Sequence, residues 1–354
     1  VFLAHSACPS VLPSASSSFQ VPPFAMSAVE PSTSVAVAGA NSPIETAKAQ
    51  SAVLFDFDGT LGDTETPAME VAFWMLAPYL PGLEGKGDEE LVQECPIFVR
   101  ENAGKAFEHM IEACDAARAA AGKAGVEATR SERGEPPELL AAVDRRRTAL
   151  GLEPVAELRR GGKEPATLLQ QQKDDTVARL AQVARPCPGV PETLSSLQAM
   201  GAAFVIATTS GKPRVPVCVD AAGLRPFFPS DALHIHSGES DFEPPRFKPA
   251  PDVYLRAASH VGLPPGQCVA VEDSASGVGS ASNAGIGLIV GYVGASHISA
   301  EQREAHARML MAGARAANGR GADLVLGDMR DLPQVVEHFA ALRAAGRGGD
   351  GQAR

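Results

Sequence analysis

The feature that most constrains this chain is an apolar run that ends in two aspartates, a glycine and a threonine. Residues 53–55 lead directly into Asp56 and Asp58, which are two positions apart and are followed by Gly59 and Thr60. A short apolar run is typical of a buried strand, and ligand chemistry in α/β folds gathers at the carboxyl ends of such strands. Two carboxylates at a buried strand end repel each other and lose solvation, which is costly unless a cation or a reaction needs them.

The two residues after the acids suit an anion. Gly59 permits a sharp backbone turn, and Thr60 offers a hydroxyl and an N–H group. The segment therefore predicts a strand end that holds a cation, an anion or both. The simpler alternative is a strand that ends in an acidic turn without a ligand.

Charge and hydropathy narrow the classes of partner. The formal net charge of -11 argues against nucleic acid or an anionic membrane as the main partner. No apolar run approaches the length of a bilayer span, so we expect a soluble protein and no membrane partner. The six cysteines are scattered without a CxxC pair, which favours reduced thiols over a disulfide framework or a zinc site.

The first fifty residues differ in composition from the rest of the chain. They are rich in Ser, Ala, Val and Pro, with Glu30 and Glu45 as the only acids and Lys48 as the only Lys or Arg. We expect residues 1–50 to be a disordered leader, and a Ser-rich, acid-poor leader favours a plastid transit peptide. The alternative is a disordered tail on a cytoplasmic enzyme.

Residues 64–185 are expected to form an inserted helical domain. Helix-favouring residues dominate there, and apolar residues recur at helical spacing. The predicted helices are residues 67–80, 97–120, 137–150 and 166–183. Residues 122–136 and 155–165 are charged, and we expect them to be flexible connections.

The rest of the chain alternates between apolar runs and helical patterns. The predicted strands after the first one are residues 202–207, 234–236, 268–271, 286–290 and 324–326. Such alternation is typical of a parallel sheet with helices on both faces. We therefore predict an α/β fold with a Rossmann-like parallel-sheet core (residues 51–63 and 186–343), a helical domain inserted into it, and a disordered tail over residues 344–354.

Polar residues follow four of the predicted strands or lie just beyond them. Each group is ordinary when taken alone: hydroxyls after a strand usually cap a helix, a lysine in a Pro-rich loop is usually solvated, and a Glu-Asp pair is often an exposed turn. The groups are Asp56/Asp58, Thr208-Thr209-Ser210, Lys248 in RFKPAPD, and Glu272-Asp273. In this order they resemble the four motifs of the haloacid dehalogenase (HAD)-like hydrolase superfamily, over about residues 51–61 and 186–328. The position of the helical insertion is similar to that of the C1 cap in the β-phosphoglucomutase-like branch.

The resemblance implies a phosphatase mechanism. Asp56 would attack phosphorus and form an aspartyl-phosphate, and Asp58 would protonate the leaving alcohol and then activate water. For this second role Asp58 needs a raised pKa, which a nearby carboxylate and partial burial can supply. Lys248 would neutralise the phosphoryl group, where charge builds in the transition state.

The resemblance also implies a metal and a phosphate site. Mg²⁺ would bind the Asp56 carboxylate, the Asp58 carbonyl and Asp273, with Glu272 bound to the ion directly or through water. The candidate phosphate-binding residues are Gly59, Thr60, Thr208, Thr209 and Lys248. We expect a monomer that hydrolyses a small phosphorylated metabolite such as a sugar phosphate.

The sequence fits three alternative functions less well. Dehalogenation is disfavoured because the haloacid dehalogenases lack an acid at the position of Asp58. A sugar-phosphate mutase shares all four motifs, but Ala68 stands where the linker of the mutases carries a histidine. A HAD fold that only binds its ligand would be expected to lose the nucleophile or the lysine, and Asp56 and Lys248 are both present.

Substrate choice is expected to lie in the helical insertion. In residues 102–107 a glycine is followed by a polar residue, as in a specificity loop. Lys105 and Arg100 are therefore candidates for binding a second anionic group of the substrate. The alternative is a solvated helix start.

Overall fold

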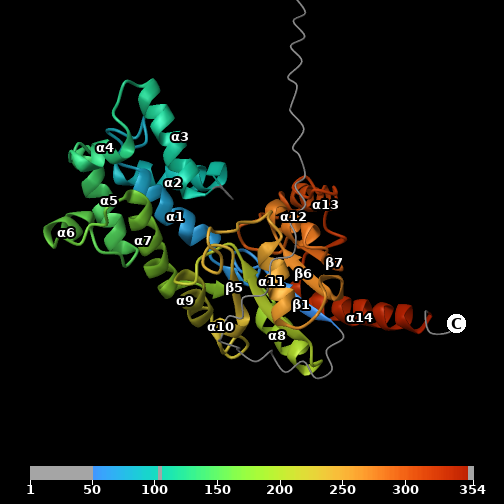
Figure 1. The fold of residues 1–354 in the computed structure, drawn as a ribbon. Helices are drawn as coiled ribbons and strands as arrows, with labels where there is room; N and C mark the ends of the chain where they lie inside the picture. Colours follow the sequence, from blue (N-terminus) through green and yellow to red (C-terminus); the bar gives the residue numbers. More distant parts are fainter. Residues whose placement is uncertain (1–50, 103–105, 350–354) are drawn as a thin grey trace, which may run out of the picture. The chain divides into compact units, whose positions relative to one another are not determined.

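The centre of the molecule is a six-stranded parallel sheet. The computed structural model describes residues 51–102 and 106–349, with side chains described up to residue 345. The strand order is β5-β4-β1-β6-β7-β8. Figure 1 shows the fold, with β1, β5, β6 and β7 labelled. The strands are β1 (Ala52–Phe55), β4 (Ala203–Thr208), β5 (Ile235–Ser237), β6 (Cys268–Glu272), β7 (Leu288–Tyr292) and β8 (Leu324–Leu326).

Strand β1 lies at the point where the chain order of the sheet reverses. Its residue Leu54 is opposite Val205 of β4 on one side and Ala270 of β6 on the other. From β1 the chain first builds the sheet outward through β4 and β5, and then returns to build β6, β7 and β8 on the opposite side. Open α/β sheets bind ligands beyond the carboxyl ends of the strands at such a reversal. The residues after Phe55 therefore occupy the favoured position for a site.

Helices cover both faces of the sheet. Val53 and Phe55 pack with α8 (Val190–Ala199), α9 (Arg214–Ala221) and α14 (Leu332–Gly349). Ala52 and Leu54 pack on the other side with α11 (Asp252–His260), α12 (Ala275–Asn283) and α13 (Arg303–Met311). Successive residues of a strand point to opposite faces, so a strand buried on both faces is apolar throughout. This explains the uninterrupted apolar run that precedes Asp56.

Residues 65–183 form a second, all-helical region, here called the inserted helical region. Its helices are α1 (Glu65–Leu76), α2 (Asp88–Asn102), α3 (Phe107–Ala120), α4 (Val126–Ser131), α5 (Pro137–Ala149), α6 (Val155–Arg160) and α7 (Leu168–Val183). It has its own apolar core, built around α1, whose residues 71–76 are all buried. A short antiparallel pair, β2 (Gly62–Asp63) with β3 (Arg185–Pro186), lies where the chain enters and leaves the region.

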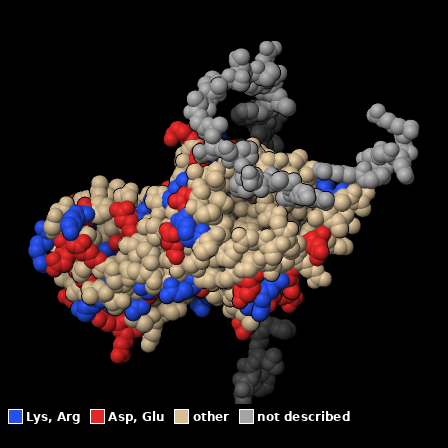
Figure 2. Space-filling model, turned by 90° about the horizontal axis from the view of Figure 1, so that it is seen from below, with Lys and Arg blue, Asp and Glu red and all other residues tan. Residues whose placement is uncertain are grey.

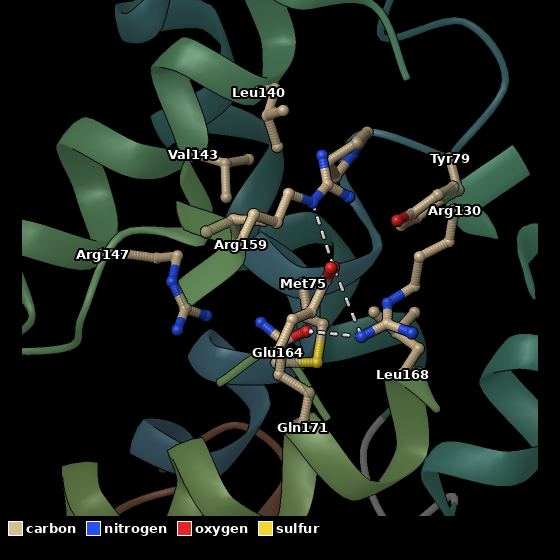
Figure 3. Close-up of a pocket in the computed structure, with 12 residues that line it drawn as sticks. Met75, Tyr79, Arg130, Leu140, Val143, Arg147, Arg159, Glu164, Leu168 and Gln171 are labelled. Carbon is tan, nitrogen blue, oxygen red and sulfur yellow. Dashed lines mark hydrogen bonds and ion pairs between the residues drawn. The ribbon is translucent and has the colours of Figure 1, made fainter. Parts of the chain in front are cut away.

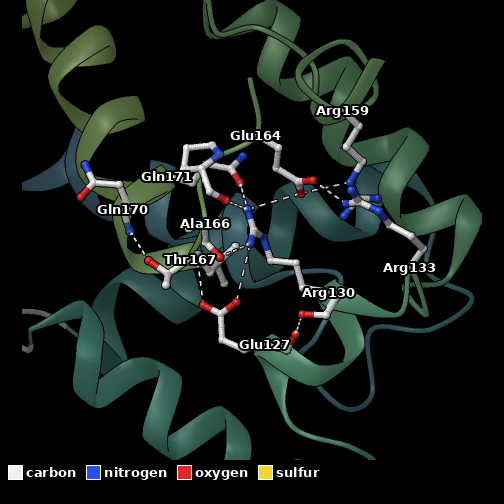
Figure 4. Close-up of polar contacts among 12 residues, drawn as sticks. Glu127, Arg130, Arg133, Arg159, Glu164, Ala166, Thr167, Gln170 and Gln171 are labelled. Atoms are coloured by element: carbon white, nitrogen blue, oxygen red, sulfur yellow. Dashed lines mark hydrogen bonds and ion pairs between the residues drawn. The ribbon is translucent and has the colours of Figure 1, made fainter. Parts of the chain in front are cut away.

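The inserted helical region also buries arginines, whose guanidinium groups donate hydrogen bonds to acceptors in the same region. Arg130 donates from Nη2 to the carbonyl of Pro165 (2.6 Å) and from Nη1 to that of Ala166 (3.2 Å). Its Nη2 also lies 3.4 Å from Oε1 of Glu164, which accepts a hydrogen bond from Arg159 (Figure 4). A buried arginine costs little when its donors are satisfied in this way.

These arginines border an internal cavity of about 20 Å³, which is roughly the space of one water molecule. Figure 3 shows Arg130 and Arg159 turned toward Glu164 at its edge. Arg147, which also lines the cavity, forms a bidentate pair with Asp175, at 2.5 Å (Nη1–Oδ2) and 3.0 Å (Nη2–Oδ1). The cavity therefore belongs to a matched charge network that holds helices together.

The parallel-sheet core and the helical insertion are confirmed, and three expectations about local structure are wrong. Residues 122–136 and 155–165 are not simple flexible connections, because they contain α4 and α6, which Arg130 and Arg159 tie to residues 164–166. The helix predicted over residues 97–120 is instead α2 and α3, with residues 103–105 outside the described part. Helix α14 continues to Gly349, past the expected tail start at 344, since Ala344 and Ala345 favour helix propagation.

Surface charge and hydropathy complete the description. Lys and Arg side chains alternate with Asp and Glu on the face seen in Figure 2, most densely on the inserted helical region. No helix in the described part of the chain is long and apolar enough to cross a membrane. The described cysteines are free thiols. The expected leader, residues 1–50, lies outside the described residues.

Candidate active site

The turn after β1 places Asp56 at the sheet end, 8% exposed, with its N–H bonded to the carbonyl of Val271 (3.0 Å). Gly59 has a φ of +80°, and a Cβ on it would lie 2.1 Å from Oδ2 of Asp273. Only glycine fits here, because the position requires a left-handed backbone and close approach to a carboxylate. The glycine of the sequence motif thus brings the first aspartate beside the last one.

Lys248 joins the first motif to the last. Its buried Nζ donates to Oδ1 of Asp56 (2.6 Å) and to Oε1 of Glu272 (2.6 Å). Tyr254 donates to the same Glu272 oxygen (2.6 Å), and its ring lies 5.1 Å from Nζ. Burial with these two carboxylates raises the pKa of Lys248, since their attraction outweighs the cost of burying the ammonium. The lysine is therefore a fixed positive charge beside Asp56.

Glu272 and Asp273 end β6 directly before α12. Ser274 caps this helix by accepting a hydrogen bond from the N–H of Gly277 (3.0 Å). A Cβ on Gly277 would lie 1.8 Å from Oε2 of Glu272, so the glycine lets the helix start approach the carboxylate. The positive end of a helix dipole favours a nearby anion. Gly277 therefore serves close packing of the helix start against the carboxylate of Glu272.

Asp56, Glu272 and Asp273, here called the carboxylate cluster, fit a divalent cation. Their ligand atoms lie within 4.8 Å of one another, and within residues 51–102 and 106–349 no other group of three or more potential ligands lies so close. Burial raises the pKa of Asp56 to about 8 despite the attraction of Lys248, because Glu272 and Asp58 repel its charge. Burial also raises the pKa of Asp273 well above its usual value. Hard oxygen ligands under mutual repulsion suit Mg²⁺.

Asp58 differs from the expectation. Its carboxylate accepts hydrogen bonds from Thr64 Oγ1 (2.5 Å), Ser210 Oγ (2.6 Å) and Arg214 Nη2 (2.6 Å). Although burial acts to raise it, Arg214 and the two hydroxyls lower the pKa of Asp58 below its usual value. The expectation of a raised pKa is wrong, because sequence reading did not find Arg214. The one feature of the sequence that points to Arg214 is its place at the start of α9, the helix that follows the hydroxyl motif.

The hydroxyl motif lies beside Asp58, at the end of β4. Thr208 Oγ1 accepts from the N–H of Ser210 (3.0 Å), and Ser237 Oγ donates to the carbonyl of Ser210 (2.8 Å). These contacts fix the turn and aim the Ser210 hydroxyl at Asp58. The hydroxyl motif therefore does more than cap a helix, because its Ser210 hydroxyl donates a hydrogen bond to the Asp58 carboxylate.

Gly59 and Thr60 are poorer phosphate donors than the sequence suggested. The N–H of Gly59 donates to the carbonyl of Gly62 (2.8 Å), and the N–H of Thr60 donates to that of Phe57 (3.3 Å). The Thr60 hydroxyl donates to Oδ1 of Asp273 (3.5 Å). Both residues shape the turn after β1, and their hydrogen-bond donors are already used by acceptors of the protein itself.

Of the two candidate specificity residues, the structure describes Arg100 and does not bring it into the site. Arg100 is exposed near the end of α2, and no hydrogen bond or ion pair connects it to the strand-end residues described above. Lys105 lies outside the described residues. Conversely, sequence reading missed His297 and His306, which both contact Asp273. Neither belongs to a motif with recognisable spacing.

Comparison with known proteins agrees with the sheet and the strand-end residues. The family model described as haloacid dehalogenase-like hydrolase matches residues 50–285. Protein CbbY of Rhodobacter capsulatus is 38% identical over 103 residues, which is 29% of this chain and 44% of that protein. A "Probable pseudouridine-5'-phosphatase" of Drosophila melanogaster is 37% identical over 123 residues, 34% of this chain and 52% of that protein. The chain thus spans about half the length of these relatives.

The fold itself is shared with a solved structure. A haloacid dehalogenase-like protein of unknown function from Agrobacterium tumefaciens superposes with a TM-score of 0.51 at 25% identity. The alignment covers 83% of this chain and all of the other. The likeness therefore extends over both the sheet and the helical insertion.

Proposed function

Because this chain belongs to the haloacid dehalogenase-like hydrolase family, we propose that it is a Mg²⁺-dependent phosphatase that hydrolyses a small phosphorylated metabolite, such as a sugar phosphate. The observation that carries this proposal is the buried contact of Lys248 Nζ with Asp56 (2.6 Å), next to the carboxylate cluster. A nucleophilic carboxylate, a fixed positive charge and a set of oxygen ligands are the parts that phosphoryl transfer needs. The relative named as a probable pseudouridine-5'-phosphatase supports the same reaction class.

In the first step of the proposed reaction, a carboxylate oxygen of Asp56 bonds to phosphorus as the ester oxygen leaves. Lys248 donates to Oδ1 of Asp56 and would turn part of its donor capacity to a phosphoryl oxygen. The hydroxyl of Thr208 and the N–H of Thr209 are the proposed donors to a second phosphoryl oxygen. Mg²⁺ bound to Asp56, Asp273 and the carbonyl of Asp58, with Glu272 beside it, would neutralise charge on the phosphoryl group.

Asp58 is proposed to carry the protons of both steps. The leaving alkoxide takes a proton from the Asp58 carboxyl, and the water that attacks the aspartyl-phosphate returns one to it. Because Arg214 keeps Asp58 ionised in the free protein, we infer that a proton is taken up with the substrate. A phosphate dianion brought close to Asp58 raises the pKa of this carboxyl and favours such uptake.

The test is release of inorganic phosphate from a panel of phosphomonoesters, with Mg²⁺ and with EDTA. We expect Mg²⁺-dependent release from at least one sugar phosphate and an acyl-phosphate on the acid-quenched protein that hydroxylamine removes. Conversion of glucose 1-phosphate to glucose 6-phosphate with a bisphosphate primer, without net phosphate release, would instead favour a mutase. Absence of turnover over the whole panel would contradict the proposal.

The inserted helical region and the leader have their own parts in this proposal. The region is proposed to act as a cap that closes over the site and excludes bulk water. A plastid location for the protein is supported by the Ser-rich, acid-poor composition of residues 1–50. Import of a fluorescent protein fused to this leader into isolated chloroplasts would test the location.

A further inference from the structure

Two histidines from outside the four motifs converge on Asp273. His297 follows β7, and its Nε2 lies 3.4 Å from the carboxylate oxygen Oδ2 of Asp273. His306 belongs to α13, and its Nε2 lies 2.5 Å from the main-chain oxygen of the same residue. A carbonyl oxygen only accepts, so Nε2 of His306 must carry the hydrogen of this bond. Both histidines lie beyond residue 285, where the match to the family model ends.

The segment that carries His297 is held rigidly across the site. Ser296 donates to Oδ1 of Asp63 (2.6 Å), at the short antiparallel strand pair that leads to the inserted helical region. Ala295 and Ile298 are buried in the same apolar core as β1. A Cβ on Gly59 would lie 2.7 Å from Cε1 of His297, so the imidazole rests directly on the nucleophile turn. The position of the ring is therefore fixed from three sides.

Asp273 needs such support more than the other two carboxylates do. Lys248 holds both Asp56 and Glu272 at 2.6 Å, but it makes no ion pair with Asp273. Among the described side chains, those within hydrogen-bond or ion-pair distance of the Asp273 carboxylate are Thr60 (3.5 Å) and His297 (3.4 Å). Without them, repulsion within the carboxylate cluster would turn Asp273 away from the point where the ligand atoms converge.

We propose that His297 and His306 are positioning residues that preorganise Asp273 for a divalent cation. His297 orients the carboxylate, and His306 fixes the main chain from which it projects. This inference rests on the proposed function in one respect, because it takes the cation to bind at the carboxylate cluster. Hydrogen-bond partners of metal ligands typically change metal affinity by about 10–100-fold when they are removed.

The experiment measures the dissociation constant of Mn²⁺ from the free-Mn²⁺ signal in electron paramagnetic resonance, on the full chain without substrate. His297→Leu and His306→Leu remove the imidazole that contacts Asp273, and we expect each to weaken Mn²⁺ binding by about tenfold or more. His297→Gln retains an N–H near the position of Nε2 and is expected to recover most of the affinity. His338→Leu, at an exposed position of α14, is the matched control and should bind Mn²⁺ like the wild type.

A folding defect is separated from a positioning role by thermal unfolding. The melting temperature in EDTA should be nearly the same for the wild type and all four variants, whereas its rise on adding Mn²⁺ should shrink only in the two leucine variants at the site. Equal Mn²⁺ affinity of the wild type, His297→Leu and His306→Leu would overturn the inference and leave the proposed function intact. A wild-type chain that binds no Mn²⁺ would instead contradict the metal site of the proposed function.

Discussion

The inserted helical region and the sheet core both bury charged side chains, but they balance them differently. In the helical region each buried arginine has its own acceptors, as in the bidentate pair of Arg147 with Asp175. At the sheet end, the carboxylate cluster gathers three acids around a single lysine, Lys248. Burying a charge is costly, and only a matched partner offsets the cost. The matched network therefore stabilises the fold, whereas the unmatched cluster leaves carboxylates available for the proposed cation and reaction.

Replacement of a buried aspartate by asparagine should affect activity and stability in opposite ways in the two regions. The largest effect is expected on the activity of the Asp56→Asn variant. Asp56→Asn removes the attacking carboxylate, so phosphate release should fall by about three orders of magnitude or more. Stability in EDTA should stay equal or rise, because the substitution removes one of the mutually repelling acids. Phosphate release and urea unfolding of the same preparation measure both effects. A variant that keeps its activity would contradict the assignment of the nucleophile.

In the inserted helical region, Asp175→Asn should lower stability and leave activity nearly unchanged. It leaves the buried Arg147 without a charged partner, so the free energy of unfolding should fall by about 3 kcal/mol. The turnover rate of the folded protein should change little, because Asp175 has no contact with the strand-end residues. Asp174→Asn, at the exposed neighbouring position, is the control. Unfolding of the two variants at the same urea concentration would show that the pair of Arg147 with Asp175 does not stabilise the fold.

The pH dependence of stability offers the smallest and most specific contrast. In the metal-free protein the pKa of Asp56 is raised from 3.8 to about 8, so between these values the folded state keeps a proton that the unfolded state has lost. The contribution of Asp56 to the free energy of unfolding is therefore fully present below the unfolded pKa and is lost as the pH rises toward 8. Relative to Asp56→Asn, the wild-type melting temperature in EDTA should fall by on the order of a few degrees between about pH 5 and about pH 8.

Glu164 of the inserted helical region should act in the opposite sense. Arg133 and Arg159 lower the pKa of Glu164 below its usual value despite partial burial. Its contribution is present above the unfolded pKa and is lost as the pH falls through the folded one. Adding Mg²⁺ should flatten the pH dependence that comes from Asp56 and leave that of Glu164 unchanged. A wild-type curve that does not respond to Mg²⁺ would count against cation binding at the cluster.

The sequence was sufficient to predict those parts of the molecule whose signal is local. Each of these parts lies next to an element whose pattern can be recognised within a few residues. They are the apolar run before Asp56, Lys248, and the Glu272-Asp273 pair. Because parallel strands end at one edge of a sheet, these local patterns could be placed together without a structure.

The remaining parts depend on partners that are far apart in the chain. Arg214 reverses the expected pKa shift of Asp58 from 156 positions away. His306 reaches the main chain of Asp273 from 33 positions away. Helices α4 and α6 were missed for the same reason, because the acceptors of Arg130 lie about 35 positions further on. A single polar residue without a repeated spacing gives no signal until the fold brings its partner close.

The short strand pair β2–β3 has a consequence for how such a molecule can change over time. Asp63 and Arg185 are directly opposite each other, so the chain leaves the sheet and returns to it at one point. Apart from Thr64, which donates to Asp58, and Leu180 and Ala184, which pack in the core with β1, the residues between them can change without altering the register of the six central strands. Under the proposed role of this region as a cap, selection for a new substrate can act on the helices, while the residues at the sheet end are inherited unchanged.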